Sequence, residues 1–183
     1  TDTPEQPFVR KPLNLSLAVD VSGSMSGDRI AAVRQALGVL VDQLRSDDVF
    51  SLVAFEREAH TLIGPTPGDQ KERLREAIDS LVASGGTNIG AGLDRSVELV
   101  REHLTMDSGS LHRVMLFTDM HPNRGMSDGR TFVRVLQDFA AEGIGVSSFG
   151  VGVHFGADKG VHVIGDMSKG ATGIWAARAL FAY

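Results

Sequence analysis

The sequence predicts an α/β fold, in which a mainly parallel sheet of six strands is covered by helices on both faces. Three observations support this. Short aliphatic runs such as Leu13–Val21 (LNLSLAVDV) are too short for helices and are typical of buried strands. These runs alternate with segments whose apolar residues recur at helical spacing. The 183 residues, 42% of them hydrophobic, suffice for one domain with a sizeable core.

Six segments are predicted as strands. They are residues 13–21, 49–55, 59–63, 114–118, 144–153 and 171–176. Glu56–Glu58 reads as a tight turn, so the segment after it is expected to be an antiparallel edge strand. Gly64–Gly68 (GPTPG) is predicted as a loop from its composition.

Helices are predicted between these strands from the spacing of their apolar residues. They begin near Ser26, after Gly68, near Ile89 and after Gly129, with a shorter helix within residues 158–169. Ser26 is expected to cap the first of them, with Asp28 near the positive end of its dipole.

Composition limits the domain organisation and the function. Residues 1–12, with three prolines, read as an extended arm or linker, and residues 13–183 as one domain, for which truncation at the C-terminus is one interpretation. The net charge of −5 argues against nucleic acid as a partner, and no apolar run is long enough to enter a membrane as a span. The absence of cysteine excludes disulfides, thiolate metal sites and cysteine nucleophiles.

Hydroxyl and carboxyl side chains stand where predicted strands end. Asp20, Ser22 and Ser24 follow the first strand, and Asp119 follows the strand that begins at residue 114. Thr87 lies in the Gly-Gly-Thr-Asn loop between them. In parallel sheets ligands bind beyond the carboxyl ends of strands, so these side chains are expected to converge if the two strands are neighbours. Two carboxylates and three hydroxyls suit a small, hard divalent cation such as Mg²⁺.

The pattern Asp20-x-Ser22-x-Ser24, then Thr87, then Asp119 resembles the metal-ion-dependent adhesion site of von Willebrand factor type A domains. The resemblance covers most of the chain and is strongest to bacterial members. It implies a doubly wound six-stranded sheet with one antiparallel edge strand. The family usually has glycine after the second aspartate, where this chain has Met120.

The resemblance also implies a function. Ser22 and Ser24 would ligate the ion directly, Thr87 directly or through water, and both aspartates mainly through water or hydrogen bonds. The cofactor would be Mg²⁺, with Mn²⁺ or Ca²⁺ as alternatives, and its open position would take an Asp or Glu carboxylate of a protein partner. The rim around the ion is assigned to a further set of residues. They are Gly23, Met25, Asn88, Met120 and His121.

The leading hypothesis is therefore a non-enzymatic adhesion or scaffold domain, in an extracytoplasmic or cell-surface setting as part of a longer protein. Two alternatives stay open: a Mg²⁺-dependent phosphatase or hydrolase, and a structural assembly domain with a vestigial site. Catalysis by Ser22 or Ser24 would need a histidine base, and neither serine lies in a G-x-S-x-G elbow. A related hypothesis is a switch in which Thr87 ligation moves the loop after Asp119.

Overall fold

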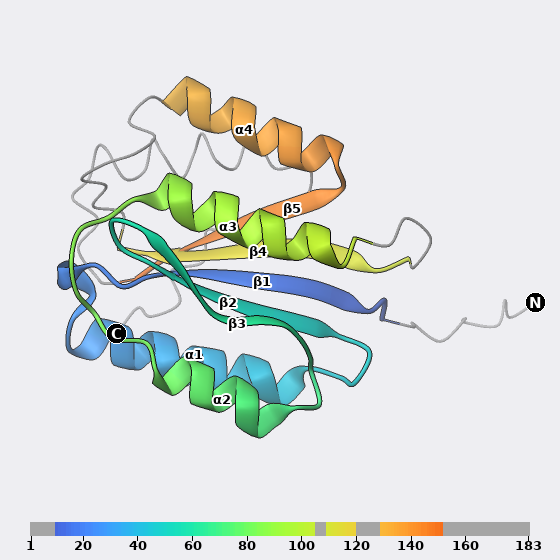
Figure 1. Ribbon diagram of the computed structural model, residues 1–183, viewed down its shortest axis with the longest axis horizontal. Helices are drawn as coiled ribbons and strands as arrows, with labels where there is room; N and C mark the ends of the chain where they lie inside the picture. The colour runs from blue at the N-terminus through green and yellow to red at the C-terminus, as the bar shows by residue number, and fades with distance from the viewer. Residues whose placement is uncertain (1–9, 105–108, 120–128, 152–183) are drawn as a thin grey trace, which may run out of the picture.

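The computed structural model describes residues 10–104, 109–119 and 129–151, and its elements alternate between strand and helix along the chain (Figure 1). In order they are β1 (Leu13–Asp20), η1 (a 3₁₀ turn, Gly23–Met25), α1 (Asp28–Gln43), β2 (Val49–Phe55), β3 (Ala59–Pro67), α2 (Lys71–Asp79), α3 (Ile89–Glu102), β4 (Leu111–Thr118), α4 (Gly129–Ala141) and β5 (Ile144–Gly150).

The described strands form one mixed sheet in the order β3-β2-β1-β4-β5. β1 pairs in parallel with β2 and β4, β4 pairs in parallel with β5, and β3 is antiparallel to β2 at the edge. The predicted α/β fold and antiparallel edge strand are confirmed. The predicted sixth strand (171–176) and the helix within 158–169 lie outside the described residues, so six strands stay a prediction.

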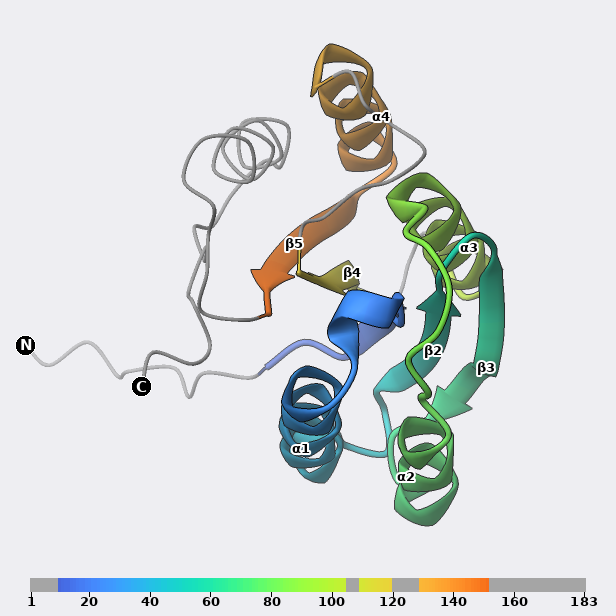
Figure 2. The same ribbon diagram turned by 90° about the vertical axis from the view of Figure 1, so that its left-hand side faces the viewer.

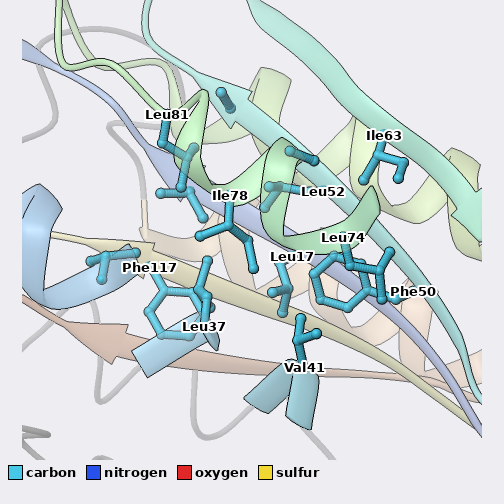
Figure 3. Close-up of a cluster of buried hydrophobic side chains, with 14 of the residues drawn as sticks. Leu17, Leu37, Val41, Phe50, Leu52, Ile63, Leu74, Ile78, Leu81 and Phe117 are labelled. Atoms are coloured by element: carbon cyan, nitrogen blue, oxygen red, sulfur yellow. The ribbon is translucent and has the colours of Figure 1, made fainter. Parts of the chain in front are cut away.

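Helices cover both faces of this sheet. α1 and α2 lie on one face and α3 and α4 on the other (Figure 2). Alternate residues of β1 pack in the two layers. Leu15, Leu17 and Val19 belong to the core beneath α1 and α2, and Ala18 belongs to the core beneath α3 and α4. Figure 3 shows Leu17 within the first of these cores. This burial on both faces explains why β1 reads as a nearly continuous aliphatic run. Within the described ranges, no helix is long and apolar enough to cross a membrane.

The structure corrects three local predictions. β3 continues through the segment predicted as a loop and ends at Pro67. Prolines are tolerated there because β3 is an edge strand, where a missing N–H need not break a ladder bond. β4 begins at Leu111 rather than Val114. The N-cap of α1 is Gly27, not Ser26, whose hydroxyl instead donates to the Gly23 carbonyl at 2.7 Å.

The strand register determines where the candidate residues lie. Val19 of β1 is level with Phe117 of β4, so Asp20 ends β1 close to Thr118, and Asp119 follows one residue later. The strand order also reverses here, because the chain goes from β1 to β2 on one side and reaches β4 on the other. The two aspartates therefore lie at the same edge of the sheet, on adjacent strands.

Candidate metal centre

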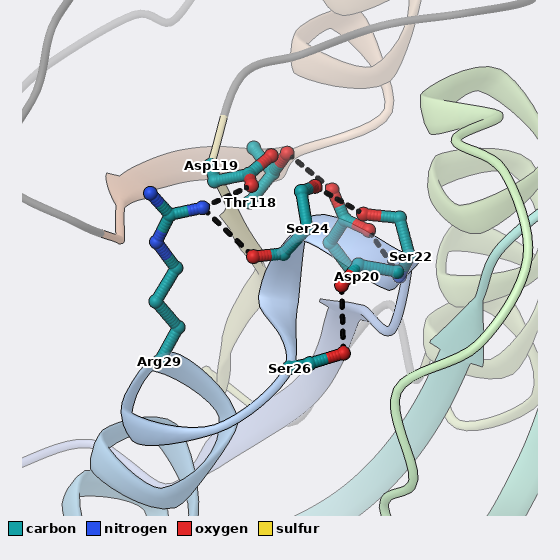
Figure 4. A network of polar contacts seen from close by, with 8 residues as sticks. Asp20, Ser22, Ser24, Ser26, Arg29, Thr118 and Asp119 are labelled. Atoms are coloured by element: carbon teal, nitrogen blue, oxygen red, sulfur yellow. Dashed lines mark hydrogen bonds and ion pairs between the residues drawn. The ribbon is translucent and has the colours of Figure 1, made fainter.

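Asp20 is fully buried at the end of β1, and both its oxygens accept hydrogen bonds from neutral donors (Figure 4). The Ser22 N–H donates to Oδ1 at 2.8 Å, and the Thr118 hydroxyl donates to Oδ2 at 2.7 Å. The first bond folds the chain back directly after the strand, and the second ties β1 to β4. Asp20 has no cationic partner among the described residues.

Ser22 and Ser24 lie on the 3₁₀ turn that follows. Their hydroxyl oxygens are 3.0 Å apart, and either one is the donor of that bond. The Met25 N–H donates to the Ser22 carbonyl at 2.9 Å, which closes the turn. The tight turn thus brings together two hydroxyls that are separated by one residue in the sequence.

Thr87 lies in a loop that is bonded to this turn. The Gly23 N–H donates to the Gly85 carbonyl at 3.2 Å, and the Ser84 N–H donates to the Val21 carbonyl at 2.5 Å. The Thr87 side chain is buried, and its hydroxyl has no hydrogen-bond partner among the described residues. Four other buried polar atoms share that state, but they belong to β1, α1, α3 and β5 rather than to the loops around Asp20.

Glu56, at the end of β2, supports the Thr87 loop. Its carboxylate accepts a bond from the Gly86 N–H at 3.3 Å, and its carbonyl accepts one from the Asn88 N–H at 2.5 Å. Gly85 has a φ of 74°, and a Cβ there would lie 1.9 Å from the Glu56 carboxylate. Glycine is therefore required at this turn on both conformational and steric grounds.

Asp119 is held by a guanidinium on α1. Arg29 Nη1 donates to Asp119 Oδ2 at 3.0 Å and to the Ser24 carbonyl at 2.7 Å, so it links the β4 end to the 3₁₀ turn (Figure 4). The Asp119 side chain is only 1% exposed, whereas that of Arg29 is 36% exposed. The ion pair therefore lies at the boundary between the buried site and solvent.

The charge of Asp20 is not balanced by a cation in the described part of the chain. Burial is the main cause that raises the pKa of Asp20, hydrogen bonds from Thr118 and Ser22 oppose it, and the nearby charge of Asp119 raises it further. The negative charge of Asp119 thus disfavours the ionised form of Asp20. A bound cation would favour the ionised form of Asp20.

The rim residues predicted from the sequence have different positions. Met25 is fully buried in the core beneath α1 and α2, so its assignment to the rim is wrong: the turn directs its side chain inward. The Asn88 side chain caps α3 by accepting from the Ala91 N–H at 3.2 Å, and it also donates to the Arg57 carbonyl. Gly23 contributes its N–H to the loop contact. Met120 and His121 lie outside the described residues.

Sequence reasoning missed three residues of this network. Thr118 ends β4 beside Asp20, and only the pairing of β1 with β4 gives it a role. Arg29 and Glu56 look like ordinary solvated charges in the sequence, and no spacing rule separates them from other exposed arginines and glutamates. Their roles follow from tertiary contacts between elements.

The donor set fits a hard divalent ion better than a softer metal that prefers sulfur or imidazole ligands. Carboxylates and hydroxyls suit Mg²⁺ or Mn²⁺. In the part of the chain that the structure describes, no group of three or more His, Cys, Asp or Glu side chains is placed to hold a metal. The candidate centre has two carboxylates and depends on hydroxyls for its other ligands. Two observations agree with such an ion: within the residues that the structure describes, the buried Thr87 hydroxyl has no hydrogen-bond partner, and the buried Asp20 has no cationic partner.

Comparisons with known proteins agree with this architecture. The uncharacterised protein YfbK of Escherichia coli K12 is 32% identical over 140 residues, which cover 76% of this chain and 24% of YfbK. The chain therefore spans about a quarter of that relative. The manganese-loaded TRAP protein of Plasmodium vivax has a similar fold, with a TM-score of 0.67 at 21% identity over 85% of this chain and 63% of that one.

A third comparison concerns the fold. The pilus adhesin SpaC of Lactobacillus rhamnosus GG has a TM-score of 0.68 at 15% identity, over 91% of this chain and 28% of that one. At this identity the likeness concerns the fold alone. The sequence profile of the von Willebrand factor type A domain matches residues 15–121, more than half of the chain. The chain belongs to the von Willebrand factor type A domain family.

Proposed function

We propose that this domain binds a divalent cation of the Mg²⁺ type at the edge of the sheet and uses it to capture an acidic side chain of a protein partner. The observation that carries the proposal is that a buried carboxylate and a buried hydroxyl, each without its usual partner among the described residues, belong to segments that are bonded to each other. Asp20 is a buried carboxylate with no cationic partner among the described residues, and Thr87 has a buried hydroxyl with no hydrogen-bond partner there.

Buried charges in proteins are normally paired or coordinate a metal, and buried hydroxyls are normally bonded. A cation near Ser22, Ser24 and Thr87 would satisfy both groups at once. A bound ion would supply an electrophilic centre for an anionic ligand. The two serine hydroxyls and Thr87 would hold it, and Asp20 and Asp119 would orient the hydroxyls by accepting their protons.

Family relatives support the proposal. The TRAP protein of Plasmodium vivax was crystallised in a manganese-loaded form, and SpaC is a pilus adhesin. Mn²⁺ can replace Mg²⁺ in an oxygen site, so the metal in this chain is proposed as Mg²⁺ with Mn²⁺ as a substitute. The description of SpaC as a pilus adhesin agrees with the predicted cell-surface setting, which stays a proposal for this chain.

Calorimetry with Mn²⁺ and Mg²⁺ tests the metal step. The unmodified protein is expected to bind about one ion, and the double variant Ser22→Ala/Ser24→Ala should lose that binding while keeping its unfolding transition. Ser26→Ala is the matched control, since Ser26 lies on the same turn but its hydroxyl bonds to the Gly23 carbonyl. Unchanged binding in the double variant would contradict the assignment.

The capture step is tested with a carboxylate probe. Bound Mn²⁺ relaxes the protons of its water ligands, and acetate is expected to lower this relaxation as it replaces one water. Relaxation that does not respond to acetate would show that the ion offers no position to an anion. In that case the structural assembly domain becomes the better description.

The hydrolase alternative gains no support from the described residues. His112, the described histidine nearest in sequence to Asp119, lies at the opposite end of β4, and its ring is 3.2 Å from the Asn14 amide. No base contacts either serine hydroxyl in the described part of the chain. Turnover of a generic phosphate ester that requires Mg²⁺ and Asp119 would reverse this preference.

A further inference from the structure

Arg29 places a permanent positive charge beside the proposed ion. Its Nη1 bonds both Asp119 Oδ2, at 3.0 Å, and the Ser24 carbonyl, at 2.7 Å. Both acceptors belong to residues assigned to the centre, one at the end of β4 and one on the 3₁₀ turn. The two bonds fix the guanidinium, so its charge cannot move away without breaking them.

The contact also uses a carboxylate oxygen that would otherwise strengthen the field at the ion. A divalent cation and a guanidinium that share the same carboxylate compete for it and repel each other. Because the Asp119 side chain is buried and that of Arg29 is 36% exposed, this competition is only partly screened by solvent.

We propose that Arg29 is a tethered cation that weakens binding of the divalent ion at this centre and holds Asp119 in place when no ion is bound. This inference rests on the proposed function, because it concerns the same centre. The inference also concerns the binding of an acidic partner side chain. Such an anion is attracted to both the ion and Arg29, and it therefore offsets the repulsion between these two positive charges. Metal and acidic ligand should therefore bind more tightly together than separately.

Three variants distinguish the effect of the Arg29 charge on ion binding from the effect of its side-chain shape. Arg29→Gln removes the charge but keeps a polar side chain of similar length, and Arg29→Lys keeps the charge. Arg75→Gln is the matched control, because Arg75 pairs with Asp42 on the exposed surface of α1 and α2, and both side chains are about half exposed.

Mn²⁺ affinity is measured by calorimetry at low and high salt. At low salt, Arg29→Gln is expected to bind Mn²⁺ roughly tenfold more tightly than the unmodified protein, a difference of about 1.4 kcal/mol, and high salt should reduce the gain. Arg29→Lys and Arg75→Gln should stay close to the unmodified affinity. In EDTA, Arg29→Gln should unfold at a lower temperature, because Asp119 loses its counter-charge.

The possible results are distinct. Weaker or unchanged Mn²⁺ binding in Arg29→Gln would overturn the inference and leave the proposed function intact, with Arg29 as a residue that positions Asp119. Tighter binding in both Arg29→Gln and Arg29→Lys would also overturn it, because charge would then not be the cause. Absence of Mn²⁺ binding in the unmodified protein would overturn the proposed function itself.

Discussion

Two buried aspartates at opposite ends of the sheet have opposite environments. Asp48 precedes β2 and accepts from Arg10 at 2.5 Å, from the Leu13 N–H at 2.8 Å and from the Arg45 N–H at 2.7 Å. Asp20 follows β1, and every donor that it has in the described ranges is neutral. Neither side chain is exposed to solvent. Asp48, with three donors that include a cation, is held as part of the fold, whereas the proposed function makes Asp20 the carboxylate that is available to a metal ion.

The pKa values of the two groups show the same contrast. Burial raises the pKa of Asp48, but the hydrogen bonds from Arg10, Arg45 and Leu13 and the charge of Arg10 outweigh it, and the net effect lowers that pKa. For Asp20 burial prevails and the pKa is raised. The two pKa shifts thus have opposite signs, and Asp48 differs from Asp20 in having a cationic partner.

Replacing Asp48 should have the largest effect on stability. Asp48→Asn removes the charge that binds Arg10 and cannot accept well from all three donors. We expect a loss of about 3 kcal/mol or more in the free energy of unfolding, measured by urea unfolding in EDTA. Asp42→Asn, which disrupts an exposed ion pair, should change it by less than about 0.5 kcal/mol. An equal loss of unfolding free energy in Asp48→Asn and Asp42→Asn would contradict the structural role assigned to Asp48.

Replacing Asp20 should affect metal-dependent stability instead. At an ion concentration of about 100 times Kd, Mn²⁺ should stabilise the unmodified protein by about 2.7 kcal/mol. Asp20→Asn should lose this gain and, in EDTA, be as stable as the unmodified protein or more so, because an amide can keep both neutral partners. A large loss of stability in EDTA would instead make Asp20 a structural residue like Asp48.

Thr87 and Thr66 offer a matched pair of buried hydroxyls. The Thr66 hydroxyl donates to the Gly64 carbonyl at 2.9 Å, whereas that of Thr87 has no partner among the described residues. Thr66→Val should therefore cost about 1 kcal/mol. In EDTA, Thr87→Val should be neutral or stabilising while weakening Mn²⁺ binding. Thermal unfolding and calorimetry on the same samples check both, and a destabilised Thr87→Val would mean that its hydroxyl is already bonded.

The pH dependence of stability should differ in sign for the two aspartates. The pKa of Asp48 is lower in the folded protein than the unfolded value of about 3.9. Its contribution is therefore present above that pH and lost as the pH falls through the folded pKa. The stability difference between the unmodified protein and Asp48→Asn should shrink in acid.

For Asp20 the folded pKa is raised, so its contribution is present at low pH and lost as the pH rises through the folded value. In EDTA, the advantage of Asp20→Asn over the unmodified protein should grow as the pH rises above the unfolded pKa of about 3.9. Urea unfolding at a series of pH values measures both trends. Parallel trends for the two variants would contradict the contrast.

The sequence predicted the strands and helices well where one pattern dominated. β2 was predicted with the bounds that the structure gives, because its apolar run is bounded by clear turns. β3 was predicted too short, since composition alone cannot show that a Gly-Pro segment lies at a sheet edge, where proline is tolerated. In this segment the position at the edge of the sheet, rather than the local preference of glycine and proline for loops, determined the structure.

The candidate centre was predictable only in part. The placement of Asp20 and Asp119 on one edge followed from strand ends and sheet topology. The inward turn of Met25 and the contact of Arg29 with Asp119 did not, because both depend on how the 3₁₀ turn packs against β4 and α1. Spacing in a sequence gives the order of such residues but not the direction of their side chains.

The central claim is that the hydroxyl oxygens of Ser22, Ser24 and Thr87 bind one divalent cation. Anomalous diffraction from crystals soaked in Mn²⁺ tests it most directly. We expect a single strong peak with these three oxygens around it, at least the two serine oxygens at about 2.1 Å, and Asp20 and Asp119 behind them. No peak there, or a peak whose ligands exclude both serines, would contradict the claim.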